Sequence, residues 1–211
     1  MSKNGADDLL VQARSVLLDA LMALSDHRDS IVVIGAQAIY LHTGAAEVAL
    51  AEATKDSDLA LDSRSLGSEP LIEAAMTRAN FTLNPDPGQP GSWINPQGIP
   101  VDLMVPEAIA GPSSRRRADI PPHSRQATRR AVGLEAAVVD HAEMQIRSLS
   151  AADPRVLSAQ VALRPCSSRS CTSWERGKLV KPGWSIRMPM TSTESSWQSR
   201  PLAWPLQLTD C

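Results

Sequence analysis

The sequence predicts an α+β fold, in which helices pack against a sheet of short apolar strands. Apolar residues at helical spacing over 7–27 predict a first amphipathic helix. The apolar run over 31–34 predicts a buried strand, and it ends at a glycine before a short helix over 36–43. The segments 92–94 and 99–105 predict two further strands around an Asn-Pro-Gln-Gly turn.

The remaining elements follow from weaker patterns. Residues 57–62 alternate between polar and apolar types, which predicts a strand with one buried face. The other expected elements are a helix over 68–79 with Ser68 as N-cap, a strand over 81–83, a short helix over 106–110, an arginine-rich loop over 111–130, and two strands over 132–139 and 143–149.

The composition changes near residues 160–165. All three cysteines and four of the five tryptophans follow Arg164, together with many serines and prolines. No apolar period of a helix or a strand continues through this part of the chain. We therefore expect a folded domain over 1–160 and an irregular, disordered tail over 161–211.

Charge and hydropathy exclude several classes of protein. The net charge of −2 excludes a uniformly basic protein, so any contact with nucleic acid would come from a local patch. No apolar run reaches the roughly 18 residues of a membrane span, and the first ten residues lack the apolar core of a secretory signal. The three cysteines show no metal-ligand spacing. We expect a cytoplasmic protein without a membrane partner.

Two carboxylates, Asp56 and Asp58, belong to the segment that predicts the strand over 57–62. Residues two apart on a strand point to the same face, so these carboxylates would project together and repel each other unless a cation lies between them. Mg²⁺ prefers such oxygen ligands and usually retains phosphate oxygens as well. The alternative is a strand face that is simply solvated.

A third acid, Asp102, lies inside the apolar segment 99–105. An acid in such surroundings is costly unless it is paired or bound to a metal. If its strand lies beside Asp56 and Asp58, the three carboxylates would form a cluster that can hold two metal ions. Such a cluster activates an attacking hydroxyl and stabilises a leaving pyrophosphate.

Gly35 joins the first predicted strand to the following helix. A glycine at this junction lets a phosphate group approach backbone N–H groups at the helix N-terminus. The alternative is that Gly35 only makes the turn.

Six arginines lie between residues 115 and 130, opposed only by Asp119. A patch of this kind can bind the phosphate backbone of RNA. The alternative is a solvated, flexible loop. The candidate RNA-binding residues are Arg115, Arg116, Arg117, Arg129 and Arg130.

Three segments together resemble the nucleotidyltransferase superfamily: VVIGAQAIYLHTG, TKDSDLAL and PVDLMV. Within it they look most like the AbiEii/MenT-type toxins of toxin–antitoxin systems. The resemblance covers residues 30–150 and implies a nucleotidyltransferase-like mixed β-sheet flanked by helices. It implies that Asp56 and Asp58 bind metal, that Asp102 is a metal ligand or base, and that Gly35, Ala36, Thr54 and Lys55 lie at the nucleotide. Ala36 replaces the usual second Gly or Ser, so a hydroxyl contact to phosphate would be missing.

The resemblance implies Mg²⁺-dependent transfer of a nucleoside monophosphate from a nucleoside triphosphate to RNA, often a tRNA 3′ end. It also implies a cognate antitoxin as protein partner. The alternative function is that of an inactive remnant that only binds an antitoxin or RNA.

The tail lacks two segments with which this family usually continues: a helix carrying a lysine, and a segment resembling Lys-Asp-Ala-x-Asp. A reading frame that joins the last base of each codon to the first two of the next can supply both. Permitted codons for 166–175 then give Leu-Val-Ala-Lys-Leu-His-Lys-Leu-Gly, and those for 184–191 give Val-Asp-Lys-Asp-Ala-His-Asp. The hypothesis is that a frameshift near residue 165 has replaced the C-terminal helical part of the family.

Overall fold

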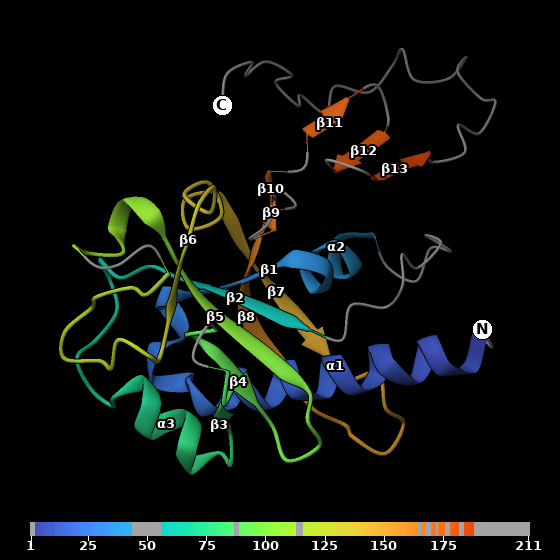
Figure 1. Cartoon of the computed structure of the whole chain (residues 1–211). Coiled ribbons are helices and arrows are strands. Elements are labelled where there is room, and N and C mark those ends of the chain that lie inside the picture. Colours follow the sequence, from blue (N-terminus) through green and yellow to red (C-terminus); the bar gives the residue numbers. More distant parts are fainter. Residues whose placement is uncertain are drawn as a thin grey trace.

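The protein is an α+β structure built on a mixed, open sheet of eight strands (Figure 1). The computed structural model describes residues 3–43, 56–86, 89–112 and 116–163, and five short strands between 166 and 187. The strand order is β3-β4-β5-β2-β1-β8-β7, and β6 also pairs with β5. The strands are β1 (Ile31–Ile34), β2 (Ser57–Leu61), β3 (Thr82–Leu83), β4 (Ser92–Ile94), β5 (Pro100–Pro106), β6 (Arg129–Ala131), β7 (His141–Arg147) and β8 (Val156–Ala162).

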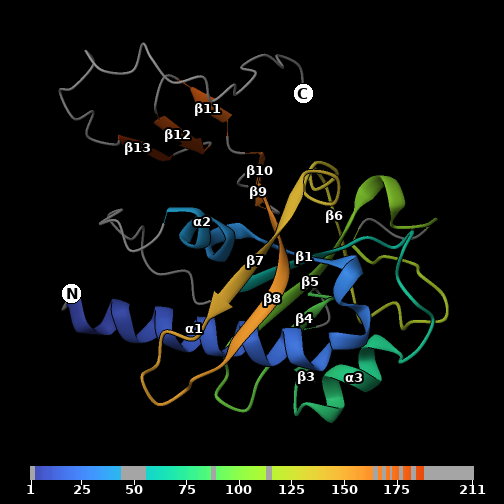
Figure 2. The same ribbon diagram turned by 180° about the vertical axis from the view of Figure 1, so that it is seen from behind.

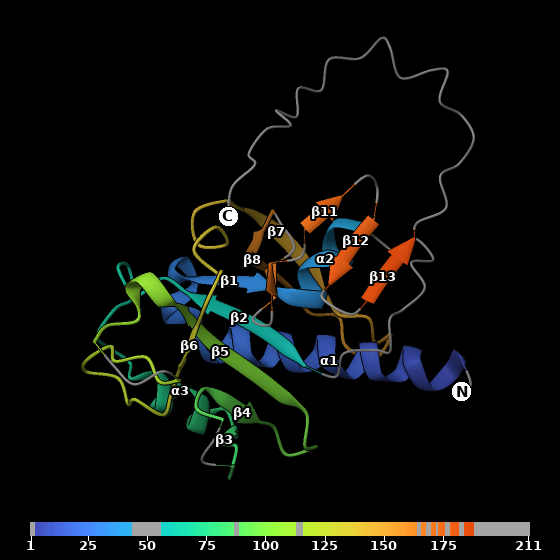
Figure 3. The ribbon, with the colours of Figure 1, turned by 45° about the horizontal axis from the view of Figure 1, so that its top comes forward.

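Helices lie mainly on one face of this sheet. The long helix α1 crosses that face, and α3 lies beside the C-terminal part of α1 (Figures 1 and 2). The helical segments are α1 (Lys3–Ala23), the 3-10 helix η1 (Ser25–Ser30), α2 (Gly35–Thr43), α3 (Ile72–Arg78) and the 3-10 helix η2 (Glu107–Ile109). Figure 3 shows α1 running beneath the sheet and α2 at its upper side, next to β1 and β2.

The core is divided by the sheet into two unequal parts. The larger part contains Leu17 and Leu18 of α1 and Leu59 and Leu103 of the central strands, all fully buried. The smaller part lies on the opposite face, where Ala60 and Met104 pack against residues 131–138. Side chains alternate between faces along a strand, so Asp58 and Asp102 point towards the smaller part, away from α1.

Most of the expected elements are confirmed with small changes in their bounds. The turn after β4 is also confirmed, since the N–H of Gly98 donates to the carbonyl oxygen of Asn95 at 2.9 Å. The helix expected over 68–79 begins only at Ile72, and Ser68 is not its N-cap. The residue before a proline is disfavoured in helical conformation, and Glu69 precedes Pro70, so the helix starts later than expected.

One strand expected after residue 130 is not formed, and one strand that is formed there was not expected. Residues 132–139 form consecutive turns instead of a strand, with Gly133 at φ +79° and a bond from the Asp140 N–H to the Ala136 carbonyl oxygen. The strand β8 was not expected, yet it pairs in parallel with β1 in the interior of the sheet. Its residues 157–161 alternate between apolar and polar types, a strand pattern that the sequence analysis did not assign.

Five short strands lie within the region expected to be irregular. They pair only among themselves, as one two-stranded and one three-stranded sheet. The expectation of an irregular, disordered tail over 161–211 stays a prediction, and residues 188–211 lie outside the described residues. The strands are β9 (Cys166–Ser167), β10 (Ser170–Cys171), β11 (Ser173–Glu175), β12 (Lys178–Lys181) and β13 (Trp184–Arg187).

Among the described residues, helices are too short or too polar to cross a membrane.

Candidate functional site

Asp58 and Asp102 lie side by side at the centre of the sheet. The strands β2 and β5 run parallel, and their register pairs Asp58 with Asp102. Neighbouring strands are about 4.8 Å apart, so two carboxylates on the same face at paired positions are direct neighbours. Both residues are partly buried. The fold thus places two negative charges together on the face of the sheet that α1 does not cover.

Gly35 packs directly against the carboxylate of Asp58. The last residue of β1, Ile34, pairs with Asp58 in the antiparallel register, and Gly35 follows at φ +66°. A Cβ atom at position 35 would lie 2.3 Å from the Asp58 Oδ2 atom. Both the left-handed backbone and the absence of a side chain are therefore needed for the start of α2 to approach this acid. Ala36 lies next, partly exposed, in the first turn of α2.

Helix α1 holds both sides of this junction through buried polar contacts. The guanidinium of Arg14 donates through Nε to the Oε1 atom of Gln37 at 2.8 Å, which ties α1 to the first turn of α2. The hydroxyl of Ser57 donates to the Ala13 carbonyl oxygen at 3.0 Å, which ties α1 to the start of β2. Burial lowers the pKa of Arg14. Sequence reasoning missed Arg14, because an arginine on an apolar helix face gives no sign of its partner.

Asp56 does not join the other two acids in a metal-binding group. It lies just before β2 and is exposed. Within the ranges that the structure describes, no three acidic, histidine or cysteine side chains are placed to hold a metal ion together. The pair Asp58 and Asp102 offers carboxylate oxygens of the kind that Mg²⁺ prefers, but the expected three-carboxylate arrangement is not formed.

Asp102 forms an ion pair with Arg129. The Nη2 atom of Arg129 lies 2.9 Å from the Asp102 Oδ2 atom, and the two side chains are 28% and 17% exposed. The same Nη2 atom lies 3.3 Å from the sulfur of Met104. Arg129 was expected to bind RNA, and the structure instead places its guanidinium on a candidate catalytic acid. A buried acid signals that a cation is nearby, but sequence alone does not say which of six arginines it is.

Gly91 brings β6, and with it Arg129, against β5. The first half of β5 pairs with β4 and its second half pairs with β6, and Gly91 lies at the change. Its carbonyl oxygen accepts from the Leu103 N–H at 2.7 Å. A Cβ atom at position 91 would lie 2.5 Å from the backbone nitrogen of Arg129 and from the carbonyl oxygen of Leu103. The close approach of the three backbones thus depends on a glycine.

The other arginines of the predicted patch fall into two groups. Arg116 and Arg117 lie beside β6 through backbone contacts. The Arg116 carbonyl oxygen accepts from the Arg130 N–H, and Arg117 forms an isolated antiparallel β-bridge with Arg129. The side chain of Arg130 donates to the Gly111 carbonyl oxygen at 2.8 Å. Arg125 instead pairs with Asp119 at 2.6 Å on the surface. The remaining predicted site residues, Thr54, Lys55 and Arg115, lie outside the described residues.

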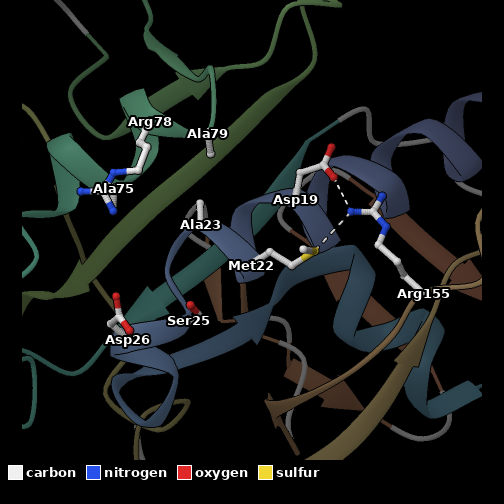
Figure 4. A pocket seen from close by; sticks show the side chains of 9 residues that line it. All are labelled: Asp19, Met22, Ala23, Ser25, Asp26, Ala75, Arg78, Ala79 and Arg155. Carbon is white, nitrogen blue, oxygen red and sulfur yellow. Dashed lines mark hydrogen bonds and ion pairs between the residues drawn. The ribbon is translucent and has the colours of Figure 1, made fainter.

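A hollow on the opposite side of the sheet involves none of these residues. Figure 4 shows it between α1, η1 and α3, with Arg155 bonded to Asp19 and Met22 at one side. It is lined by Asp19, Met22, Ala23, Ser25, Asp26, Ala75, Arg78, Ala79 and Arg155. Arg155 is paired with Asp19 and Asp153, and the hollow lies on the face of the sheet away from Asp58 and Asp102.

The chain matches no protein-family model, no curated protein and no solved structure. Support for a function therefore comes from the geometry of Asp58, Asp102 and Gly35 and from the three sequence segments.

Proposed function

We propose that this chain is a nucleotidyltransferase of the toxin type, which transfers a nucleoside monophosphate from a nucleoside triphosphate to RNA. The observation that carries the proposal is the pairing of Asp58 with Asp102 on neighbouring parallel strands, directly beside the Gly35 turn. Two neighbouring acids, both partly exposed, and a helix that begins at a glycine beside them suit the binding of a triphosphate and a cation.

Each part has a chemical role in this proposal. The first N–H groups of α2 lack partners within the helix, so they can donate to phosphate oxygens near Gly35. Asp102 accepts the proton of the RNA hydroxyl that attacks the α-phosphate, and pyrophosphate leaves. Mg²⁺ is the proposed cofactor, and Asp58 and Asp102 are the residues that would hold it. When bound, the cation neutralises phosphate charge.

The proposed partners are RNA, with a tRNA 3′ end as the first candidate, and an antitoxin protein. For RNA the support is an arginine strip at β6 formed by Arg129 and Arg117, which lie opposite each other and share the face of Asp102. Arginines at this edge lie close to Asp102, because β6 pairs directly with β5. An RNA backbone held by the strip would reach the acid pair without crossing the helical face of the sheet.

A second candidate is an inactive remnant that only binds RNA or an antitoxin. Two observations favour it: Asp102 is neutralised by Arg129, and Asp56 is not gathered with the other acids in the described part of the chain. Such a protein would keep the arginine strip and bind RNA without modifying it.

Incorporation of labelled nucleotide into RNA separates the two candidates. The chain is incubated with each labelled nucleoside triphosphate, Mg²⁺ and total tRNA, beside Asp58→Asn and Asp102→Asn. The matched control is Asp62→Asn, which removes a carboxylate that is 16% exposed and pairs with Arg64 just after β2. We expect labelling by the parent chain and by the control, and a loss of at least about a hundredfold in both site variants. Labelling that persists in Asp58→Asn contradicts the enzyme, and RNA binding without labelling supports the remnant.

A further inference from the structure

The geometry points to Arg129 as an internal cation of the acid pair: we propose that its guanidinium competes with a divalent cation for Asp102. The inference uses the proposed function only in taking Asp58 and Asp102 as the site. It starts from a difference between expectation and structure, since the place beside Asp102 where a metal ion was expected is taken by Arg129.

The ion pair lies where solvent screens it only partly. Arg129 is 28% exposed and Asp102 is 17% exposed; in the neighbouring pair Arg125 is 65% exposed and Asp119 is 13% exposed, so the two pairs differ in the arginine. A charge pair that is partly removed from water is stronger than a surface pair, and breaking it leaves an acid that seeks another cation. Solvent therefore screens the guanidinium of Arg129 less than that of Arg125.

The backbone fixes Arg129 at this position. In the parallel register of β5 and β6, Met104 pairs with Arg129, two residues beyond Asp102 and on the same face. Gly91 leaves room for this pairing, and its N–H donates to the carbonyl oxygen of Gln126 at 2.8 Å, three residues before Arg129. The guanidinium is thus held in place by the sheet and is not carried on a loose loop.

The charge balance explains what this arrangement does. Asp58 and Asp102 are like charges at paired positions and repel each other, and a cation between or beside them relieves the repulsion. An arginine stays charged at every accessible pH, so it supplies that relief permanently. A divalent cation that binds the pair must displace the guanidinium from Asp102 or share the carboxylate with it. Arg129 therefore weakens metal binding and stabilises the metal-free state.

Mn²⁺ binding, followed by electron paramagnetic resonance, tests this directly on the full chain. We expect Arg129→Gln to bind Mn²⁺ about tenfold more tightly than the parent, because one competing charge is removed. The matched control is Arg125→Gln. It removes the same charge, four residues before Arg129, from the pair that Arg125 forms with Asp119. Its affinity for Mn²⁺ should equal that of the parent. Equal gains in both variants, or no gain in Arg129→Gln, overturn the proposal.

A double-mutant cycle identifies Asp102 as the residue for which the two cations compete. In an Asp102→Asn background, Arg129→Gln should no longer change Mn²⁺ affinity, since the shared carboxylate is gone. A tenfold gain that persists in this background overturns the proposal. Should Arg129→Gln fail to fold by circular dichroism, Arg129→Lys replaces it. The lysine lacks the planar fork and should bind Mn²⁺ about threefold more tightly than the parent; an unchanged affinity again overturns the proposal.

Failure of this inference and failure of the proposed function give different results. Tighter Mn²⁺ binding by Arg129→Gln in a chain that never labels RNA supports the competition and contradicts the enzyme. RNA labelling by the parent chain, together with an unchanged Mn²⁺ affinity of Arg129→Gln, supports the enzyme and contradicts the competition.

Discussion

The two faces of strands β2 and β5 differ sharply, although both are formed by the same two neighbouring parallel strands. The face towards α1 carries Leu59, Leu61 and Leu103, all fully buried. The other face carries Asp58 and Asp102 beside small or flexible residues such as Ala60 and Met104. One face therefore holds the fold together and the other is available for chemistry. Substitutions on the two faces should have separable effects.

The largest effect on stability is expected on the face towards α1. Leu103→Ala removes a fully buried side chain from the larger core and should lower the free energy of unfolding by about 2–5 kcal/mol. The control is Leu83→Ala, whose leucine is 36% exposed at the edge of the sheet. Its loss should be well under half as large. Urea unfolding followed by circular dichroism measures both, and equal losses would contradict the described core.

The next effect concerns the turn at which the two faces meet. Gly35→Ala must place a Cβ atom against the Asp58 carboxylate and adopt a left-handed backbone, at a combined cost of about 2–3 kcal/mol. Gly98→Ala is its matched control, because Gly98 has φ +78° but no atom within 4 Å of the added Cβ. It should cost only about 1 kcal/mol, the conformational part alone.

The difference between these two glycine variants reports the contact with Asp58. In an Asp58→Ala background that difference should shrink towards zero, because the carboxylate that the new methyl group meets is absent. Chemical unfolding of the four variants provides the measurement. A difference that survives the removal of the carboxylate would mean that Gly35 is needed for another reason.

The smallest effect is a pH dependence from the helical side of the sheet. His123 is buried, accepts from the Ile72 N–H through Nδ1 and contacts the Gly67 carbonyl oxygen through Nε2. Burial lowers the pKa of His123, and the nearby positive charge of His27 lowers it further, against the opposite effect of the Gly67 bond and of Glu73 and Glu69. The unfolded chain therefore takes up the proton first as pH falls.

It follows that stability is highest above the unfolded histidine pKa of about 6.5 and decreases as pH falls through that value towards the lower folded pKa. Protonation of Nδ1 would also break the bond to the Ile72 N–H at the start of α3. Unfolding free energies at pH 7.5 and 5.5 should show the decrease, and His123→Gln should reduce it. Stability that rises on acidification over this range would refute the assignment.

The sequence predicted the elements whose signals are local. The strands β1 and β5 are short apolar runs, and the turn between β4 and β5 has the residues that such a turn demands. It did not predict β8, whose place depends on pairing with β1 more than a hundred residues earlier. The alternation of Ser158 and Gln160 with apolar neighbours is a local strand signal, but it does not say that the strand pairs with β1 in the interior of the sheet. The valines of 132–139 predicted a strand, but this segment forms turns, with Gly133 in a left-handed conformation.

The candidate site shows the same division. That Asp58 and Asp102 belong to one face followed from alternation, and the parallel register of β2 and β5 places them together. Neither the exclusion of Asp56 nor the choice of Arg129 as partner was open to sequence reasoning. The first depends on where β2 begins, and the second depends on the register in which β6 pairs with β5 after a long loop. The buried pair of Arg14 and Gln37 escaped for the same reason, since its two members come from different helices.

The doublet Arg129-Arg130 gives the β5–β6 pairing a tolerance to changes in chain length. The loop before β6 ends at Thr128, and the insertion or deletion of one residue there would slide β6 by one position along β5. Such a slide turns every side chain to the opposite face of a sheet. Here it would remove Arg129 from the face of Asp102 and present Arg130 on that face instead. After a deletion Arg130 would pair with Met104, and the acid would keep a positive neighbour through an alteration that normally destroys such a contact; after an insertion Arg130 would pair with Pro106, two residues further along β5.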